Sequence, residues 1–198
     1  KKYGVQVGAH PGLPDLQGFG RRKMAISPAE AEADVMYQIG ALKAFCDAAD
    51  VPLHHVKPHG ALYNMAAKDP ALAAAICRAV QAAAPSAVLL ALSGSEMVKA
   101  AHAIGLPVAS EVFADRGYKP DGTLVPRGIS GAMIEDEDTA IARVLQMAKQ
   151  RTVQADDGSI VALQADSVCV HGDGPKALAF VQKISAALPA SGVEVKAF

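Results

Sequence analysis

The polar residues that could do chemistry in this chain lie where short apolar runs end. In order along the chain they are His10, Lys57, His59, Ser93, Glu111, Asp115, His171 and Asp173. If the apolar runs are parallel strands, their C-terminal ends form one face, which is where ligands bind in α/β folds. The spacing therefore predicts that five strand ends aim ionisable groups into one cleft.

A glycine-rich polar loop follows the first apolar run and contains Asp15, Arg21 and Arg22. Glycines let the backbone approach a ligand closely, and adjacent arginines can clamp a carboxylate or a phosphate. A turn-rich loop with solvated arginines explains the two arginines equally well. For His10 and Asp15 we favour a functional role.

Lys57 closes an apolar run, a position that is costly for a lysine unless it meets an anion. Glu111 and Asp115 stand four residues apart after another run, and a carboxylate near a lysine is a usual pairing of general base and electrostatic partner. A structural ion pair is the alternative for these carboxylates. Glycines beside His171 and Asp173 could present backbone N–H groups to an anion.

Standard cofactor motifs are absent from the sequence. Neither G-x-x-x-x-G-K-[ST] nor G-x-G-x-x-G occurs, so a standard nucleotide-binding loop is not supported. No C-x-x-C spacing is present either, and a divalent metal held by His and Asp stays open.

The elements that must position these residues alternate in type. Runs of strand length occur at 5–9, 53–56, 87–92, 108–112, 168–170 and 193–195. A segment of helical period starts at Ser27 and carries an apolar stripe of Val35, Ile39, Leu42 and Cys46. Further segments of helical period lie at 70–84, 95–104, 138–150 and 175–188. The alternation predicts an α/β fold with a parallel sheet or barrel. Ser27, Pro28 and Glu30 predict a capped helix start, and Asp157-Gly158 predicts a hairpin turn within 152–163.

Composition excludes several classes of function. The chain has 198 residues, 51% of them hydrophobic, and a net charge of −1, which gives no attraction to nucleic acid or an anionic membrane. No apolar run approaches the roughly 20 residues that span a bilayer. Three separated cysteines fit buried thiols in a reducing compartment, which predicts a cytoplasmic protein. With no linker or repeat, residues 1–198 are expected to form a single domain.

The chain resembles the LamB/YcsF family in four segments that occur in order: HPGLPDLQGFGRR, KPHGALYN, SEVFADRGYKPDGTLVPR and VHGDGPKA. The resemblance implies a seven-stranded, TIM-like βα barrel of the glycoside hydrolase/deacetylase type. It also implies ATP-dependent opening, with Mg, of the lactam 5-oxoproline to L-glutamate, together with two further subunits, B and C. Family members usually begin with strands resembling DLNCDLGE and NIACGFHAGD, which do not occur here, so about two N-terminal βα units are expected to be lacking.

For this reaction the candidate roles are concrete. Glu111 or Asp115 could activate water, and Lys57 could stabilise charge on a carbonyl or phosphate oxygen. The histidines His10, His59 and His171 could shuttle protons or hold a metal. The full catalytic set is His10, Asp15, Lys57, His59, Glu111, Asp115 and His171, and the substrate-binding set is Arg21, Arg22, Asn64, Arg116 and Asp173.

Two other functions stay open. A metal-dependent deacetylase of the same fold would also use a cleft rich in His and Asp, and a non-catalytic scaffold subunit would fit an incomplete barrel. An incomplete barrel would expose strand edges, so we expect the chain to self-associate into a homo-oligomer.

Overall fold

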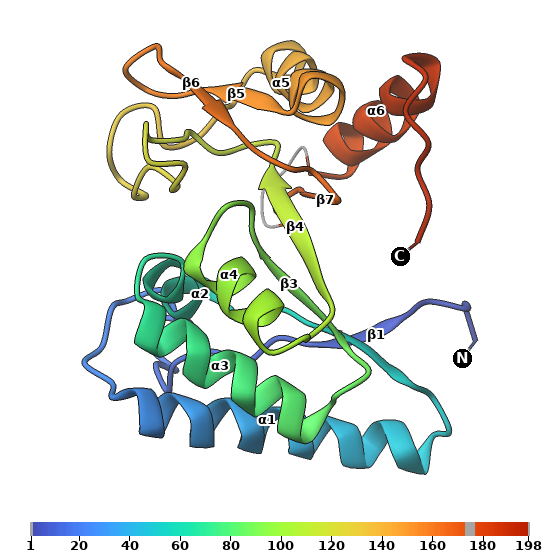
Figure 1. The fold of residues 1–198 in the computed structure, drawn as a ribbon. Coiled ribbons are helices and arrows are strands. Elements are labelled where there is room, and N and C mark those ends of the chain that lie inside the picture. Colours follow the sequence, from blue (N-terminus) through green and yellow to red (C-terminus); the bar gives the residue numbers. More distant parts are fainter. Residues whose placement is uncertain (1, 173–176, 198) are drawn as a thin grey trace. The chain divides into compact units, whose positions relative to one another are not determined.

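The fold alternates strands and helices along the chain, as expected for the α/β class. A computed structural model describes residues 2–172 and 177–197, and Figure 1 shows them as a ribbon. The chain divides into two compact units, one up to Ala109 and one from Ser110 onward. Organisation as a single domain stays a prediction.

The first unit is built around parallel strands. Its elements are β1 (Val7–Ala9), α1 (Pro28–Ala48), β2 (Leu53–Val56), α2 (Gly60–Ala66), α3 (Pro70–Ala83), β3 (Val88–Leu92) and α4 (Glu96–Ala103). β2 lies between β1 and β3 and is parallel to both. Because β1 and β2 are parallel neighbours, the segments that follow them leave the sheet at the same edge.

Helix α1 begins as its sequence predicts. Ser27 is the N-cap, Pro28 is the first helical residue, and the side chains of Ser27 and Glu30 form a reciprocal capping box. Val35 and Ile39 on the apolar stripe are buried. Figure 1 shows α1 side by side with α3, whose Leu72, Ile76 and Val80 are also buried, so the stripe supplies one wall of this unit's core.

Removing the cap is expected to weaken the fold. Ser27→Ala deletes the side-chain acceptor of the Glu30 N–H and should lower the free energy of unfolding by about 1 kcal/mol in urea titration. The matched control is Ser86→Ala, at an exposed turn residue outside any helix. Equal losses in the two variants would contradict a role for the cap.

The second unit contains most of β4 (Val108–Phe113), which begins in the first unit and pairs in parallel with β7 (Ser167–Cys169). Its other elements are α5 (Glu137–Gln150), β5 (Thr152–Gln154), β6 (Ile160–Ala162) and α6 (Ala177–Ala190). β5 and β6 form the predicted antiparallel hairpin around Asp157-Gly158. The Asp166 carboxylate accepts from the Ser110 N–H at 2.9 Å and fastens the start of β7 to β4.

One sequence expectation about elements was wrong, and one helix was missed. Residues 193–195 do not form a strand: within the described residues they have no ladder partner, and Val195 is 59% exposed, so the run lacks both hydrogen bonds and burial. Helix α2 was not expected, because Pro58 and Gly60 flank its start and both residues usually mark breaks. The predicted substrate-binding residue Asp173 lies outside the described residues.

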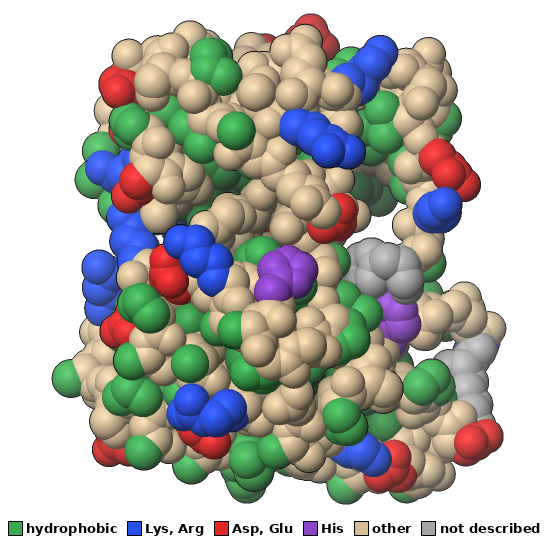
Figure 2. Space-filling view, in the orientation of Figure 1, with side chains coloured by type: hydrophobic (Ala, Val, Ile, Leu, Met, Phe, Trp, Pro, Cys, Tyr) green, Lys and Arg blue, Asp and Glu red, His purple; other side chains and the backbone are tan. Residues whose placement is uncertain are grey.

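The surface carries both signs of charge. On the face shown in Figure 2, basic and acidic side chains are interspersed, with apolar side chains among them. Within residues 2–172 and 177–197, no helix is both long enough and apolar enough to cross a membrane.

Candidate functional site

In the first unit, two predicted histidines meet just beyond the parallel ends of β1 and β2. The Nε2 atom of His10 lies 3.0 Å from Nδ1 of His59, and the rings meet edge to face with centroids 4.7 Å apart. Nδ1 of His10 faces the Lys57 carbonyl oxygen, and Nε2 of His59 faces the Phe19 carbonyl oxygen at 2.7 Å. The backbone continues the parallel ladder here, since the Lys57 N–H donates to the Ala9 carbonyl at 2.9 Å.

The glycine-rich loop of residues 11–27 closes against these strand ends. The Ala61 N–H donates to the Gly20 carbonyl at 2.9 Å, and a Cβ built on Gly60, whose φ is +56°, would lie 2.5 Å from that carbonyl oxygen. Only glycine fits this approach, which explains the glycine after His59. Phe19 packs its ring edge to face on His59 at 5.1 Å, and the Arg21 guanidinium lies over the Phe19 ring.

Asp15 organises the loop from inside. Its buried carboxylate accepts from the Gly18 N–H at 2.9 Å, from the Arg22 N–H at 3.3 Å, and from the Arg22 guanidinium. The Arg22 hydrogen bond is the largest reason that the pKa of Asp15 is lowered to about 2. These contacts favour a positioning role for Asp15 and Arg22, and their predicted roles in catalysis and substrate binding stay predictions.

The charged state of Asp15 predicts a pH-dependent stability. A carboxyl whose folded pKa is about 2 and whose ordinary pKa is 3.8 stabilises the fold above 3.8, and this contribution is lost as the pH falls toward 2. In urea unfolding, Asp15→Asn should therefore be less stable than the unaltered protein at neutral pH, and the difference should narrow as the pH falls through this window. Glu135→Gln, at an exposed carboxyl, is the control. A difference that stays constant with pH would contradict the prediction.

Gln38 was missed by the sequence analysis. Its side-chain amide accepts from the Gly12 N–H and donates to the Gly12 carbonyl, both at 2.9 Å, and so fastens the loop to α1. The one signal was a polar residue beside Ile39 on the apolar stripe. Phe19 was also missed, because an aromatic residue in a polar loop does not reveal that its carbonyl and its ring both contact His59.

Lys57 and Asn64 occupy different environments. The Lys57 ammonium lies 5.9 Å from the centre of the Tyr63 ring, and its charge is one of those that lower the pKa of His10. The Asn64 side chain donates to the Gly60 carbonyl of its own helix at 2.9 Å, which accounts for one of its two amide hydrogens. Of the two, Lys57 is the better placed to stabilise negative charge on a ligand at the strand ends.

In the second unit, Asp115 and His171 form a dyad beyond the ends of β4 and β7. Nδ1 of His171 lies 2.8 and 3.0 Å from the two Asp115 carboxylate oxygens, and the His171 ring stacks on Phe113 with centroids 5.9 Å apart. A carboxylate that accepts a hydrogen bond from Nδ1–H fixes the tautomer and leaves Nε2 as the nitrogen that can accept a proton. Glu111 is 2% exposed and, being two residues from Phe113, lies on the same face of β4.

Arg116 is engaged by its own loop. Its buried guanidinium donates to the Ala132 carbonyl at 3.1 Å and to the Val125 carbonyl at 2.6 Å. Burial lowers its pKa, with the nearby Arg127 charge adding to the effect. This geometry favours a role in shaping the loop after β4, and the predicted contact of Arg116 with a substrate carboxylate stays a prediction.

The structure thus groups the predicted residues into two sets, one in each unit. His10, Lys57 and His59 lie together in the first unit, and Asp115 and His171 lie together in the second. Convergence of both sets on one cleft stays a prediction.

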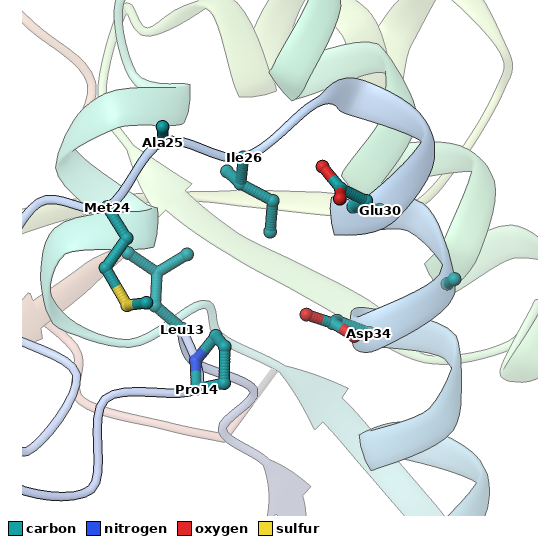
Figure 3. A pocket seen from close by; sticks show the side chains of 8 residues that line it. Leu13, Pro14, Met24, Ala25, Ile26, Glu30 and Asp34 are labelled. Carbon is teal, nitrogen blue, oxygen red and sulfur yellow. The ribbon is translucent and has the colours of Figure 1, made fainter.

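A pocket of about 280 Å³ in the first unit does not contain these groups. It is lined by Leu13, Pro14, Met24, Ala25, Ile26, Glu30, Ala33 and Asp34. Figure 3 shows the side chains of Glu30 and Asp34 on α1 opposite the apolar side chains of the loop. Glu30 is already used in the capping box, so we assign the candidate site to the strand ends rather than to this pocket.

Whether the protein could hold a metal ion depends on how its His, Cys, Asp and Glu side chains are grouped. Among the described residues, no group of three or more His, Cys, Asp or Glu side chains is close enough to hold a metal ion. A bound divalent metal stays a prediction, and no chemical step is assigned to one.

Comparison with known proteins links these residues to one family. The LamB/YcsF family pattern matches residues 1–198. The A subunit of 5-oxoprolinase from Clostridium beijerinckii is 57% identical over 195 residues, covering 98% of this chain and 76% of that protein. The protein of the same name from Bacillus subtilis is 56% identical over 194 residues, with the same coverage.

A solved structure is also similar. The crystal structure of a lactam utilization protein from Thermus thermophilus matches with a TM-score of 0.89 and 49% sequence identity. The match covers 100% of this chain and 78% of that one.

Proposed function

Because this chain belongs to the LamB/YcsF family, we propose that it acts as the A subunit of a 5-oxoprolinase, which hydrolyses the lactam 5-oxoproline to L-glutamate. The observation that carries the proposal is identity of 55–57% with the A subunits of three 5-oxoprolinases, over 98% of this chain. The similarity to a lactam utilization protein supports the same substrate class.

We propose that the reaction depends on ATP, with Mg. A lactam carbonyl is a poor electrophile because its nitrogen donates electron density. Transfer of a phosphoryl group from ATP to the carbonyl oxygen would make the ring carbon open to attack by water. ADP leaves when the phosphoryl group is transferred. Water then adds to the ring carbon, the ring C–N bond breaks, and the nitrogen takes up a proton to become the amino group. The acyl phosphate that results is hydrolysed by a second water, which gives the side-chain carboxylate of glutamate and inorganic phosphate.

The Asp115–His171 dyad suits the water-activating step. With Nδ1–H held by the carboxylate, Nε2 of neutral His171 can accept a proton from water and later return it to the leaving nitrogen. Asp115 acts through His171, as a positioning residue that also stabilises the imidazolium while the proton is held. Glu111, on the same face of β4, is the alternative base.

We propose that the first unit supplies charge stabilisation. Lys57 would stabilise negative charge on the carbonyl or phosphoryl oxygen, and Arg21, on the surface of the glycine-rich loop, would bind the substrate carboxylate. The loop is held for this purpose by Asp15 and Gln38.

The wider organisation is also part of the proposal. The parallel strands would belong to a seven-stranded TIM-like barrel that forms a single domain. The protein would work with 5-oxoprolinase subunits B and C and would self-associate. Three free cysteines, Cys46, Cys77 and Cys169, fit a cytoplasmic location.

The test is an assay of the intact protein with subunits B and C. We expect glutamate to be released from 5-oxoproline only when ATP is supplied. Glutamate release without ATP, or deacetylation of an acyl sugar that depends on added zinc, would instead support the metal-dependent deacetylase. No turnover on either substrate, with the complex intact, would support a scaffold role.

A further inference from the structure

The histidine pair at the ends of β1 and β2 has an unusual hydrogen-bonding arrangement. All four ring nitrogens of the two histidines make a polar contact. The contacts form one chain that runs from the Lys57 carbonyl through His10 and then His59 to the Phe19 carbonyl. The inner contact joins two nitrogens, Nε2 of His10 and Nδ1 of His59, that are 3.0 Å apart.

Counting protons along this line fixes its charge. A carbonyl oxygen can only accept, so Nδ1 of His10 and Nε2 of His59 must each carry a hydrogen. The inner contact is then a hydrogen bond only if one more proton lies between the two nitrogens, because two lone pairs 3.0 Å apart would repel. Three protons on four imidazole nitrogens give the pair one positive charge.

The environment places this charge on His59. The pKa of His10 is lowered, chiefly by partial burial of its ring and further by the nearby His59, Lys57 and His55 charges, while its hydrogen bond to the Lys57 carbonyl opposes the change. A neutral His10 donates from Nδ1 and accepts at Nε2. In that arrangement His59 is the donor of the inner hydrogen bond, and both of its ring nitrogens would carry a proton.

The surroundings of the pair are positively charged as well. Among the residues that the structure describes, the charged groups that act on His10 are all basic, from β2 and the segment after it. The Asp15 carboxylate in the facing loop is committed to Arg22, and the Arg21 guanidinium lies 5.4 Å from the centre of the Phe19 ring, which itself packs on His59. His10 is exposed, so a ligand from solvent can reach this group of positive charges.

We propose that His10 and His59 hold one shared proton as a unit and that this cationic pair, together with Lys57, is a binding site for an oxyanion. His59 carries the charge, and His10 is a positioning residue that keeps His59 doubly protonated. The identity of the anion rests on the proposed function: it is the carboxylate of 5-oxoproline or a phosphoryl group of ATP.

The protonation state is tested on the unaltered protein by NMR of the histidine ring nitrogens near neutral pH, with signals assigned from His10→Gln and His59→Gln. We expect both nitrogens of His59 to be protonated, and His10 to carry a proton on Nδ1 alone. Two neutral rings would overturn the proposal, whether or not the complex hydrolyses 5-oxoproline. Conversely, the expected spectrum would stand even if the enzyme assay failed.

Anion binding is tested by following the same ring signals during titration with inorganic phosphate, 5-oxoproline and the uncharged lactam 2-pyrrolidinone. Saturable shifts with phosphate alone assign the site to a phosphoryl group, and shifts with 5-oxoproline alone assign it to the substrate carboxylate. Equal shifts with 2-pyrrolidinone, or none with either anion, would overturn the proposal.

Variants show whether anion binding depends on the charge of His59 or only on the folded structure around it. His59→Gln removes the cation and should weaken anion binding on the order of tenfold, as expected for loss of a charge-assisted contact. His10→Gln keeps a side-chain acceptor for Nδ1–H of His59 and should weaken binding less. His102→Gln, at an exposed position of α4, is the matched control. If His59→Gln does not fold, the ring-nitrogen spectrum of the unaltered protein decides alone.

Discussion

His171→Gln is expected to lower ATP-dependent glutamate release by roughly 10²–10⁴-fold, the range that a positioned general base contributes. The reason is geometric: the Asp115 carboxylate holds Nδ1 of His171 at 2.8 Å, so the ring is fixed with Nε2 as its basic atom. Glutamine can mimic a hydrogen-bond donor or acceptor but cannot take up a proton near neutral pH. Rates are measured with the intact protein and subunits B and C.

Asp115→Asn gives an independent check on the same dyad. An asparagine amide can donate a hydrogen bond to Nδ1, whereas a carboxylate can only accept one. The proton of His171 can therefore move to Nε2, which then cannot act as a base, and the rate should fall by a similar factor. His102→Gln is the control, since it removes an exposed histidine outside both groups. Near-normal turnover in both dyad variants would exclude the dyad and leave Glu111 as the candidate base.

Lys57→Ala is expected to cut the same rate roughly a hundredfold or more, as removal of one preorganised charge stabiliser typically does. Lys57 follows β2, its backbone carbonyl faces His10, and its charge acts on His10. We therefore expect it to stabilise negative charge that develops on a carbonyl or phosphoryl oxygen at these strand ends. The measurement is again glutamate released per unit time with ATP present.

The control for this variant is Lys99→Ala, which removes an exposed lysine that pairs with Glu96 within α4. Urea unfolding of both variants separates folding from catalysis. If Lys57 were merely structural, Lys57→Ala would lose stability and keep normal turnover in the folded fraction.

Most of the elements could be predicted because their signals are local. The α1 start depends on Ser27, Pro28 and Glu30, which lie within one turn, and the hairpin depends on two turn residues between short β runs. Val193–Val195 shows the limit of such signals, since an apolar run becomes a strand only where a partner strand is present.

The candidate residues were found because chemistry-bearing side chains follow apolar runs, but their individual roles depend on contacts between distant parts of the chain. His10 meets His59 across 49 residues and Asp115 meets His171 across 56, and no local pattern encodes either pairing. Parallel pairing of β1 with β2, and of β4 with β7, brings these pairs together.

Asp15 and Arg116 show the same limit for charged residues. A catalytic role is predicted for Asp15 and a contact with the substrate carboxylate for Arg116, and in the structure both side chains are buried against their own loops. A sequence indicates that a charge is present. Whether that charge faces a ligand or stabilises a loop depends on which donors and acceptors the folded backbone places around it, because a buried polar group must take the partners that lie within hydrogen-bond distance.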